Sequence, residues 1–377
     1  MIVYYFILFF FLFFSFLDVI IKKNDKLFIT FLILFLLSFF WGLRYKLGVD
    51  WLFYIDEYNQ KKHTLSIEYG YKFISSIFNN LGINYFLFQF FITVFFLFTI
   101  SYFYGKYSRY RVFCILSLFL FNFIFYIEAI RQIIALSLVI ISYNFTIKNK
   151  YIASLALIIL ASFFHVSALI LTISTTLFFL NSERIYRLLL VSLSFFLLLN
   201  IVNIYPIDII LFSFKSLVTT PFIEKIYWYT QEKNSILTIS LILKLLVSFI
   251  FFRKTKHIKE NKIISFIKYN LIFLLLINLS IGMYGTISTR LEVYYIPILI
   301  LSLSYIIMLT KNILKKCILL FLFVSYFSVS FIKITNIDYF KNHYTPYNNY
   351  LIMDEYNKND YREKAVEQFW KEKKNEQ

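Results

Sequence analysis

A glutamate and an arginine, Glu128 and Arg131, stand between two long apolar stretches of the sequence. Their spacing of three residues allows an ion pair on one face of a helix. The alternative is a binding role, because an arginine fork at a helix end suits phosphate or diphosphate where the helix dipole also favours negative charge. On that interpretation Arg131 forms part of an anion-binding site.

Segment 41–60 places a basic and an acidic residue among aromatic rings. Arg44 ends an apolar run, and Asp50 stands beside Trp51 and Tyr54. An aromatic face stacks on a sugar ring, and a carboxylate accepts hydrogen bonds from sugar hydroxyl groups. The segment therefore predicts a sugar-binding site, although an interfacial aromatic belt with incidental charges would have the same composition.

Two further places combine polar groups with apolar surroundings. His165 lies deep in an apolar run, where a lone histidine is usually a satisfied core residue. At a turn that faces a cavity it would instead donate to phosphate or accept a proton. Arg290 ends a segment, 283–290, that is rich in small and hydroxylated residues, and Glu292 follows it.

Several kinds of site have no counterpart in the sequence. It contains no glycine-rich phosphate loop, no metal-ligand spacing and no nucleophile elbow. Cys114 and Cys317 both lie in apolar runs and are interpreted as small hydrophobic residues. We therefore expect neither a metal nor a cofactor.

The elements that must position these residues are membrane helices. Of the 377 residues, 60% are hydrophobic and 16% are charged, against about a quarter charged in soluble proteins. The fold class predicted is an all-α, polytopic membrane helix bundle of about 11–12 transmembrane helices without a soluble domain. Residues 1–332 form the transmembrane domain, with outer loops 44–82 and 206–235, and residues 333–377 form a polar tail. Apolar runs occupy residues 2–21, 27–43, 83–104, 112–127, 132–147, 151–180, 187–205, 236–252, 262–282, 291–310 and 313–332.

The positions of the basic clusters decide how the 30-residue run 151–180 is treated. If this run turns back near Phe164 and His165, all the basic clusters between runs fall on one side, as the positive-inside rule requires. The chain would then have twelve helices with both termini outside, and two short helices, broken or partly re-entrant, would replace one long span. The isolated polar residues would share the outer face: Arg44, Asp50, Glu128, Arg131, His165, Arg290 and Glu292.

Taken together, these motifs resemble those of the EpsG-like, Wzy-type polysaccharide polymerases of bacteria, which include the O-antigen polymerases. The resemblance covers about residues 40–300 and rests on short motifs: GLRY at 42–45, GVD at 48–50 with Tyr54, RQIIA at 131–135, FHVSA at 164–168 and RLEVY at 290–294. Valine and tryptophan flank Asp50 where the family often has threonine and tyrosine, which leaves the acid in place. The motif positions carried over are Arg44, Gly48, Asp50, Arg131, Gln132, His165, Ser167 and Arg290.

The resemblance implies an enzyme of the bacterial cytoplasmic (inner) membrane that joins undecaprenyl-diphosphate-linked oligosaccharide units on the outer face. Its partners would be the lipid-linked oligosaccharide, the bilayer, and the chain-length regulator and flippase of the same pathway, with no nucleic acid. Transfer needs cationic groups on the departing diphosphate and a base beside the acceptor hydroxyl. Arg131 and Arg290 are the candidates for the diphosphate clamp, with Arg44 as a third contact and Glu292 beside them.

The base and the reaction both stay open at this point. Asp50 and His165 are equal candidates for the base, because neither has a visible partner in the sequence. A flippase for lipid-linked oligosaccharides would need charges along a bundle lumen instead of at one face. An O-antigen ligase would use the same donor but another acceptor, and a membrane acyltransferase would usually want a histidine and aspartate pair within the bilayer.

Overall fold

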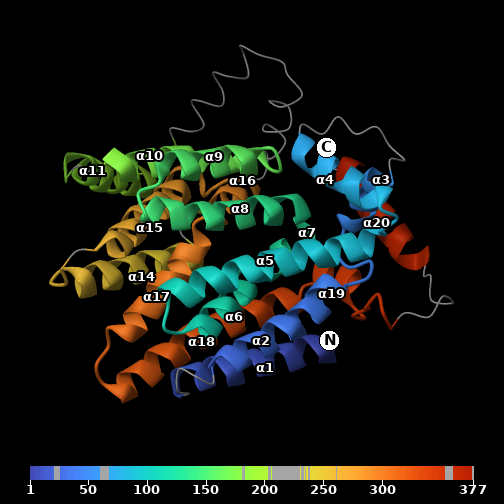
Figure 1. The fold of residues 1–377 in the computed structure, drawn as a ribbon, viewed down its shortest axis with the longest axis horizontal. Helices are drawn as coiled ribbons and strands as arrows, with labels where there is room; N and C mark the ends of the chain where they lie inside the picture. The colour runs from blue at the N-terminus through green and yellow to red at the C-terminus, as the bar shows by residue number, and fades with distance from the viewer. Residues whose placement is uncertain are drawn as a thin grey trace, which may run out of the picture. The chain divides into compact units, whose positions relative to one another are not determined.

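The structure of the protein is a computed structural model. It describes residues 1–20, 26–59, 68–180, 183–202, 235–236, 238–259, 261–352 and 360–375, together with residues 205, 230 and 233. These residues form helices joined by turns (Figure 1), with one isolated β-bridge between Arg44 and Asn349. The predicted outer loop 206–235 lies almost entirely outside the described residues, as do parts of loop 44–82 and of the tail.

Within the described residues, each apolar run identified in the sequence lies largely on helix. Six helices of the described residues are long and apolar enough to cross a membrane, because about 20 residues span the roughly 30 Å of hydrocarbon. They are α1 (Ile2–Ile20), α5 (Tyr85–Tyr107), α8 (Ile130–Ile147), α11 (Glu183–Ile201), α15 (Lys262–Ile281) and α18 (Ile313–Thr335). The chain is therefore an all-helical, multi-pass membrane protein.

The remaining runs are broken or short, so full-length spans are fewer than the 11–12 predicted. α16 (Gly285–Glu292) and α17 (Ile296–Met308) form a pair bent by 63°, which would make a seventh span. α14 (Ile239–Thr255) has 17 residues. The other short apolar helices are α2 (Lys26–Leu37) with its π-helical extension η1 (Ser38–Gly42), α6 (Arg111–Phe121) followed by α7 (Phe123–Glu128), α9 (Tyr151–Ser162) and α10 (Ile170–Leu180).

The long run 151–180 turns back where the charge pattern predicts. α9 ends at Ser162, a 3-10 helix η2 (Val166–Leu169) follows, and α10 leads away. The rings of Tyr151 and Phe179 lie against each other, so the start of α9 lies beside the end of α10. The predicted hairpin at His165 is thus confirmed. Twelve residues of helix rise about 18 Å, which is too short for a full span.

The chain divides into two compact units. Unit 1 comprises Met1–Ile140, the hairpin tip Leu160–Val166, and Thr310–Gln377. In unit 1, α1 packs on α6 and α18, and η1 packs on α5. The hydroxyl of Tyr4 donates to the carbonyl of Tyr344 at 2.7 Å. The start of α1 and the segment after α18 therefore meet at one end of the unit.

The segment after α18 binds the segment that follows η1. It contains α19 (Asp338–Tyr344) and α20 (Asp360–Asn375). Gly48 N–H donates to His343 O at 3.1 Å, Tyr45 N–H donates to Asn348 O at 3.0 Å, and Arg362 Nη1 donates to Lys46 O at 2.9 Å. The backbone of segment 43–50 is thus held by residues about 300 positions later in the sequence, through two backbone bonds and the Arg362 side chain.

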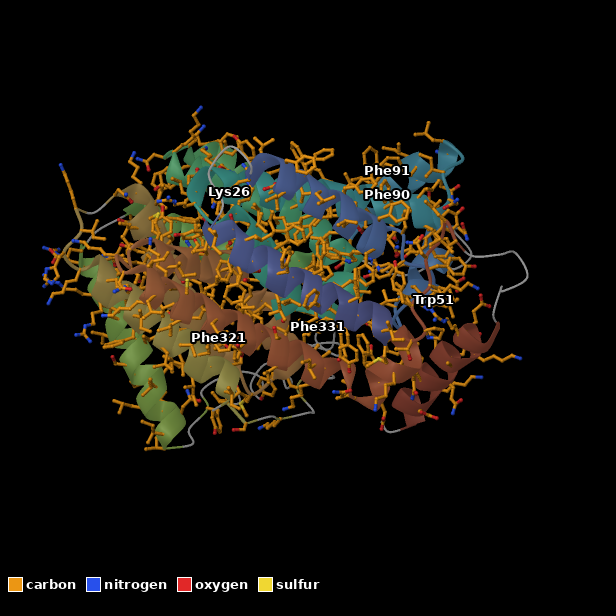
Figure 2. All side chains as sticks on the ribbon, turned by 90° about the horizontal axis from the view of Figure 1, so that it is seen from below. Lys26, Trp51, Phe90, Phe91, Phe321 and Phe331 are labelled. Atoms are coloured by element: carbon orange, nitrogen blue, oxygen red, sulfur yellow. The ribbon has the colours of Figure 1, made fainter. Side chains whose placement is uncertain are left out.

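Unit 1 presents aromatic side chains on its outer surface. Phe91 on α5 is 48% exposed and Phe321 on α18 is 59% exposed, whereas Phe331 is fully buried (Figure 2). Exposed apolar surface of this kind suits a lipid environment. The predicted outer loop 44–82 contains two helices, α3 (Trp51–Tyr58) and α4 (Tyr69–Asn80), which pack on each other in the same unit.

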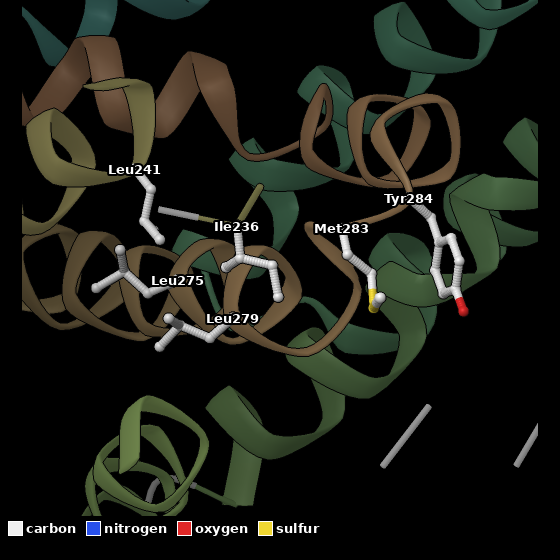
Figure 3. Close-up of a cluster of buried hydrophobic side chains, with 6 residues drawn as sticks. All are labelled: Ile236, Leu241, Leu275, Leu279, Met283 and Tyr284. Carbon is white, nitrogen blue, oxygen red and sulfur yellow. The ribbon is translucent and has the colours of Figure 1, made fainter. Parts of the chain in front are cut away.

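Unit 2 comprises Ile141–Ile159 and Ser167–Leu309. In this unit α15 packs against α11, α14, α16 and α17. One apolar cluster joins the start of α14, the second half of α15 and the turn before α16 (Figure 3): Ile236, Leu241, Leu275, Leu279, Met283 and Tyr284.

Candidate active site

Arg131, in the first turn of α8, is held by two carboxylates. Its Nη1 donates to Glu68 Oε2 at 2.8 Å, and its Nη2 bonds to Glu57 Oε2. Glu57 lies on α3, and Glu68 is the residue before α4. The side chains of Arg131 and Glu57 are 12% and 4% exposed, so both charges are withdrawn from water and depend on each other.

Three aromatic rings surround the Arg131 guanidinium. Its central carbon lies 5.2 Å from the ring centre of Phe53 and 5.1 Å from those of Tyr54 and Tyr71. Such contacts stabilise a cation on a ring face. Burial raises the pKa of the Tyr54 and Tyr71 hydroxyl groups above the usual tyrosine value, so these hydroxyl groups stay neutral.

His165 at the hairpin tip reaches the same group of charges. Its Nε2 lies 3.8 Å from Glu68 Oε1, while the other oxygen of Glu68 accepts from Arg131. The N–H of Gly70, at the start of α4, donates to Phe163 O at 2.9 Å and ties the tip to α4. Arginine, carboxylate and imidazole therefore form a chain within unit 1.

Glu128 does not pair with Arg131, which was one of the two interpretations of their spacing. Its Oε1 accepts from Val49 N–H at 3.1 Å and from the Tyr339 hydroxyl at 2.7 Å. Burial raises the pKa of the Glu128 carboxyl, and these hydrogen bonds oppose that shift. Gly48 has φ +88°, and a Cβ there would lie 2.9 Å from Glu128 Oε1, so the glycine of the GVD motif permits this approach.

Arg44 lies in the same unit, and its guanidinium donates hydrogen bonds to backbone carbonyl groups. Its Nη1 donates to Trp41 O at 2.8 Å and its Nη2 to Ile127 O at 2.5 Å. Only 3% of the residue is exposed, and burial lowers the pKa of the guanidinium to about 10. These contacts join the ends of η1 and α7, which favours a positioning role for Arg44 over direct contact with a ligand.

The other predicted residues of unit 1 lie around this group. Asp50 precedes α3 and is half-buried. Trp51 is buried, with Lys46 Nζ 5.3 Å from its ring centre. Gln132 is buried beside Arg131 in α8. The structure thus brings Arg131, His165 and Tyr54 together and adds Glu57 and Glu68.

Arg290 and Glu292 belong to unit 2. The carbonyl of Arg290 accepts from Ser167 Oγ at 3.4 Å, and Ser167 Oγ lies 3.1 Å from the Tyr294 hydroxyl. Glu292 is buried and bonds to Lys244 Nζ at 2.5 Å. Across the described residues, histidine, cysteine and carboxylate side chains do not gather in any group of three that could hold a metal ion.

Sequence reasoning missed Glu57, Glu68 and Lys244. Lys244 could have been found, because a single lysine inside an apolar membrane run indicates a functional or paired group. Glu57 and Glu68 gave no comparable signal, since both lie in a segment whose composition is mixed.

The fold and these buried charges define a multi-pass membrane protein with an ionisable, aromatic-lined site at helix ends. Residues 26–349 match the model of the EpsG family, and the chain belongs to this family. The resemblance inferred from the motifs is thereby confirmed, over a longer range than the motifs span. Membership indicates a polymerase-type role in exopolysaccharide or O-antigen synthesis. No curated protein and no solved structure matches the chain.

Proposed function

We propose that the protein is a Wzy-type polysaccharide polymerase that joins undecaprenyl-diphosphate-linked oligosaccharide units on the outer face of the bacterial cytoplasmic membrane. The anomeric carbon of the growing chain loses its bond to the diphosphate and gains a bond to a hydroxyl oxygen of the incoming unit. The hydroxyl proton passes to a base, and polyprenyl diphosphate leaves. This chemistry needs neither a nucleotide nor a metal.

The group formed by Arg131, Glu57, Glu68 and His165 under three aromatic rings carries the proposal. Such a group combines an imidazole that can take a proton with carboxylates that can accept hydrogen bonds from sugar hydroxyl groups. Burial strengthens the electrostatic interactions of the group relative to those in water. Glu57 on α3 and Glu68, the residue before α4, supply the two carboxylates, and both lie in the predicted outer loop 44–82.

We assign His165 as the base that takes the acceptor proton. A carboxylate close to an imidazole stabilises its protonated form, and Glu68 Oε1 lies 3.8 Å from His165 Nε2. Arg131 holds Glu68 from the other side. Asp50 is the competing base, and the variants below separate the two.

Arg290 is the better candidate for the leaving diphosphate. Two carboxylates already offset the charge of Arg131, so a diphosphate there would have to displace one of them. Direct binding of diphosphate by Arg131 remains the alternative role. The variant Glu57→Gln distinguishes these two roles of Arg131. Polymerisation should be kept or improved if Arg131 binds diphosphate, and it should fall if Arg131 instead organises the two carboxylates. The remaining predicted binding residues, Trp51, Tyr54 and Gln132, are proposed to contact the glycan.

The test is the polysaccharide made by a strain that lacks the gene. Loss of a polymerase leaves single repeat units on the lipid carrier and on the final acceptor, so the polymer ladder collapses to one band. Loss of a ligase would leave polymer on the carrier, and loss of a flippase would leave units on the cytoplasmic face. An unchanged ladder, or either of the last two results, would refute the proposal.

Complementation then tests the roles. His165→Gln should restore no polymer, whereas Asp50→Asn should restore some. The reverse result would make Asp50 the base. Arg187→Lys serves as the control, because Arg187 pairs with Glu183 at an exposed position.

A further inference from the structure

An ammonium, an amide and a carboxylate meet inside unit 2. Lys244 Nζ lies 2.5 Å from Glu292 Oε2 and donates to Asn278 Oδ1 at 2.9 Å. Asn278 Nδ2 donates to the same Glu292 oxygen at 2.9 Å. The side chains of Lys244 and Glu292 are 2% and 10% exposed. Each buried charge therefore has its counter-charge and a hydrogen bond within this triad, as burial of charge requires.

The triad joins three helices near one end of each. Lys244 lies in the second turn of α14, Asn278 in the last turn of α15, and Glu292 is the last residue of α16. Directly after Glu292 the chain bends by 63° into α17. A residue fixed at such a bend also fixes the direction of the helix that precedes it, here α16.

Arg290 lies in that helix, one turn or less from the anchored residue. Its carbonyl has a further contact, from Ser167 Oγ at 3.4 Å. The apolar cluster of Figure 3 also packs against α16 through Ile287. Apolar contacts are not directional, whereas the hydrogen bonds of the triad fix both a distance and an orientation.

We infer that Lys244 and Asn278 are positioning residues for polysaccharide transfer, which set the place of Arg290 by holding Glu292. Glu292 belongs to the same device and does not contact the substrate. The inference rests on the proposed function, in which Arg290 binds the diphosphate of the lipid-linked unit.

The kinetic test uses the full chain in proteoliposomes with lipid-linked repeat units. A misplacement of about 1 Å in a positioning group lowers a rate by roughly a hundredfold. Lys244→Met should therefore lower kcat per folded molecule to that extent, with a smaller change in KM. Exchange of the two charges, Lys244→Glu with Glu292→Lys, should recover part of the rate.

A double-mutant cycle tests whether Lys244 acts through Arg290. Lys244→Met combined with Arg290→Lys should be no slower than the slower single variant, because both changes remove one function. Arg187→Met on α11 is the additive control. If the double variant is slower than wild type by the product of the two single factors, the inference is overturned. It is also overturned if the Lys244→Met protein is less abundant but has the wild-type rate per folded molecule.

A second readout does not depend on activity. Spin labels at Thr286→Cys on α16 and Leu246→Cys on α14, in a chain with Cys114→Ser and Cys317→Ser, report the distance between these helices. Lys244→Met should broaden that distance distribution, and an unchanged distribution would overturn the inference. A wild-type chain that makes no polymer would instead refute the proposed function, while the labels still decide whether the triad orients α16.

Discussion

Replacement of Arg131 by lysine gives the sharpest test of the charged group in unit 1. The guanidinium bonds to Glu68 through Nη1 and to Glu57 through Nη2. Lysine keeps the charge but presents it at one point, so it can serve one of the two carboxylates. One charge-assisted hydrogen bond is lost, which is worth about 1.5–3 kcal/mol. If the bond is needed in the transition state, Arg131→Lys should lower the polymerisation rate about tenfold to a hundredfold.

The assay is the initial rate of polymer formation by the purified protein in proteoliposomes, divided by the amount of folded protein. Arg187→Lys is the matched control, because the side chains of Arg187 and Glu183 are 72% and 78% exposed and exposed ion pairs contribute little. Arg131→Lys should be slow and Arg187→Lys normal. A rate for Arg131→Lys within threefold of wild type would refute the reasoning that the fork organises the site.

Four further outcomes are expected. Glu68→Gln should reduce polymerisation more than Glu57→Gln, because Glu68 contacts both Arg131 and His165; equal rates in the two variants would count against a role of the Glu68–His165 contact. Gly48→Ala should lower the unfolding temperature more than Gly82→Ala, since both glycines have positive φ but only a Cβ at residue 48 meets neighbouring atoms; equal shifts would count against crowding at Glu128. Burial raises the pKa of Glu128, so the folded state holds this proton more tightly and stability should fall as pH rises from about 4.3, the usual glutamate value, through the folded pKa; Glu128→Gln should flatten this dependence of the unfolding temperature, and parallel curves would contradict it. Topology reporters fused after Thr146 and after Leu180 should give the same side of the membrane, because the chain turns back between them; opposite sides would show that α9 and α10 cross as one span.

Hydropathy predicted where helices occur, since the described part of each apolar run lies largely on helix. The charge pattern predicted the hairpin at His165, because positive charge is kept to one side of a membrane. The lengths of the individual helices were less predictable from the sequence. The break at Asn122 and the bend after Glu292 interrupt helices, but neither changes the average hydropathy of its apolar run.

The partners of the charged residues could not be predicted from one sequence. Arg131 pairs with residues 63 and 74 positions away, and no local spacing encodes such a pairing. The prediction placed Arg131 and His165 on one face, and unit 1 brings them together through Glu68. An arginine side chain such as Arg44 suits phosphate, but its position in the sequence could not reveal that the guanidinium donates to two backbone carbonyl groups.

The contacts that residues 338–352 and 360–370 make with segment 43–50 bear on the order of assembly during synthesis. The bond from Tyr4 to Tyr344 joins residues 340 positions apart, and the ribosome makes all of unit 2 in the interval. Until that late segment emerges, Gly48 N–H and Lys46 O lack the partners they have in the finished protein. A chain released after Leu309 would contain all residues of unit 2. Segment 43–50, which precedes α3, would lack its hydrogen bonds to the residues after α18. Premature termination near the end of the message should therefore abolish function without preventing insertion.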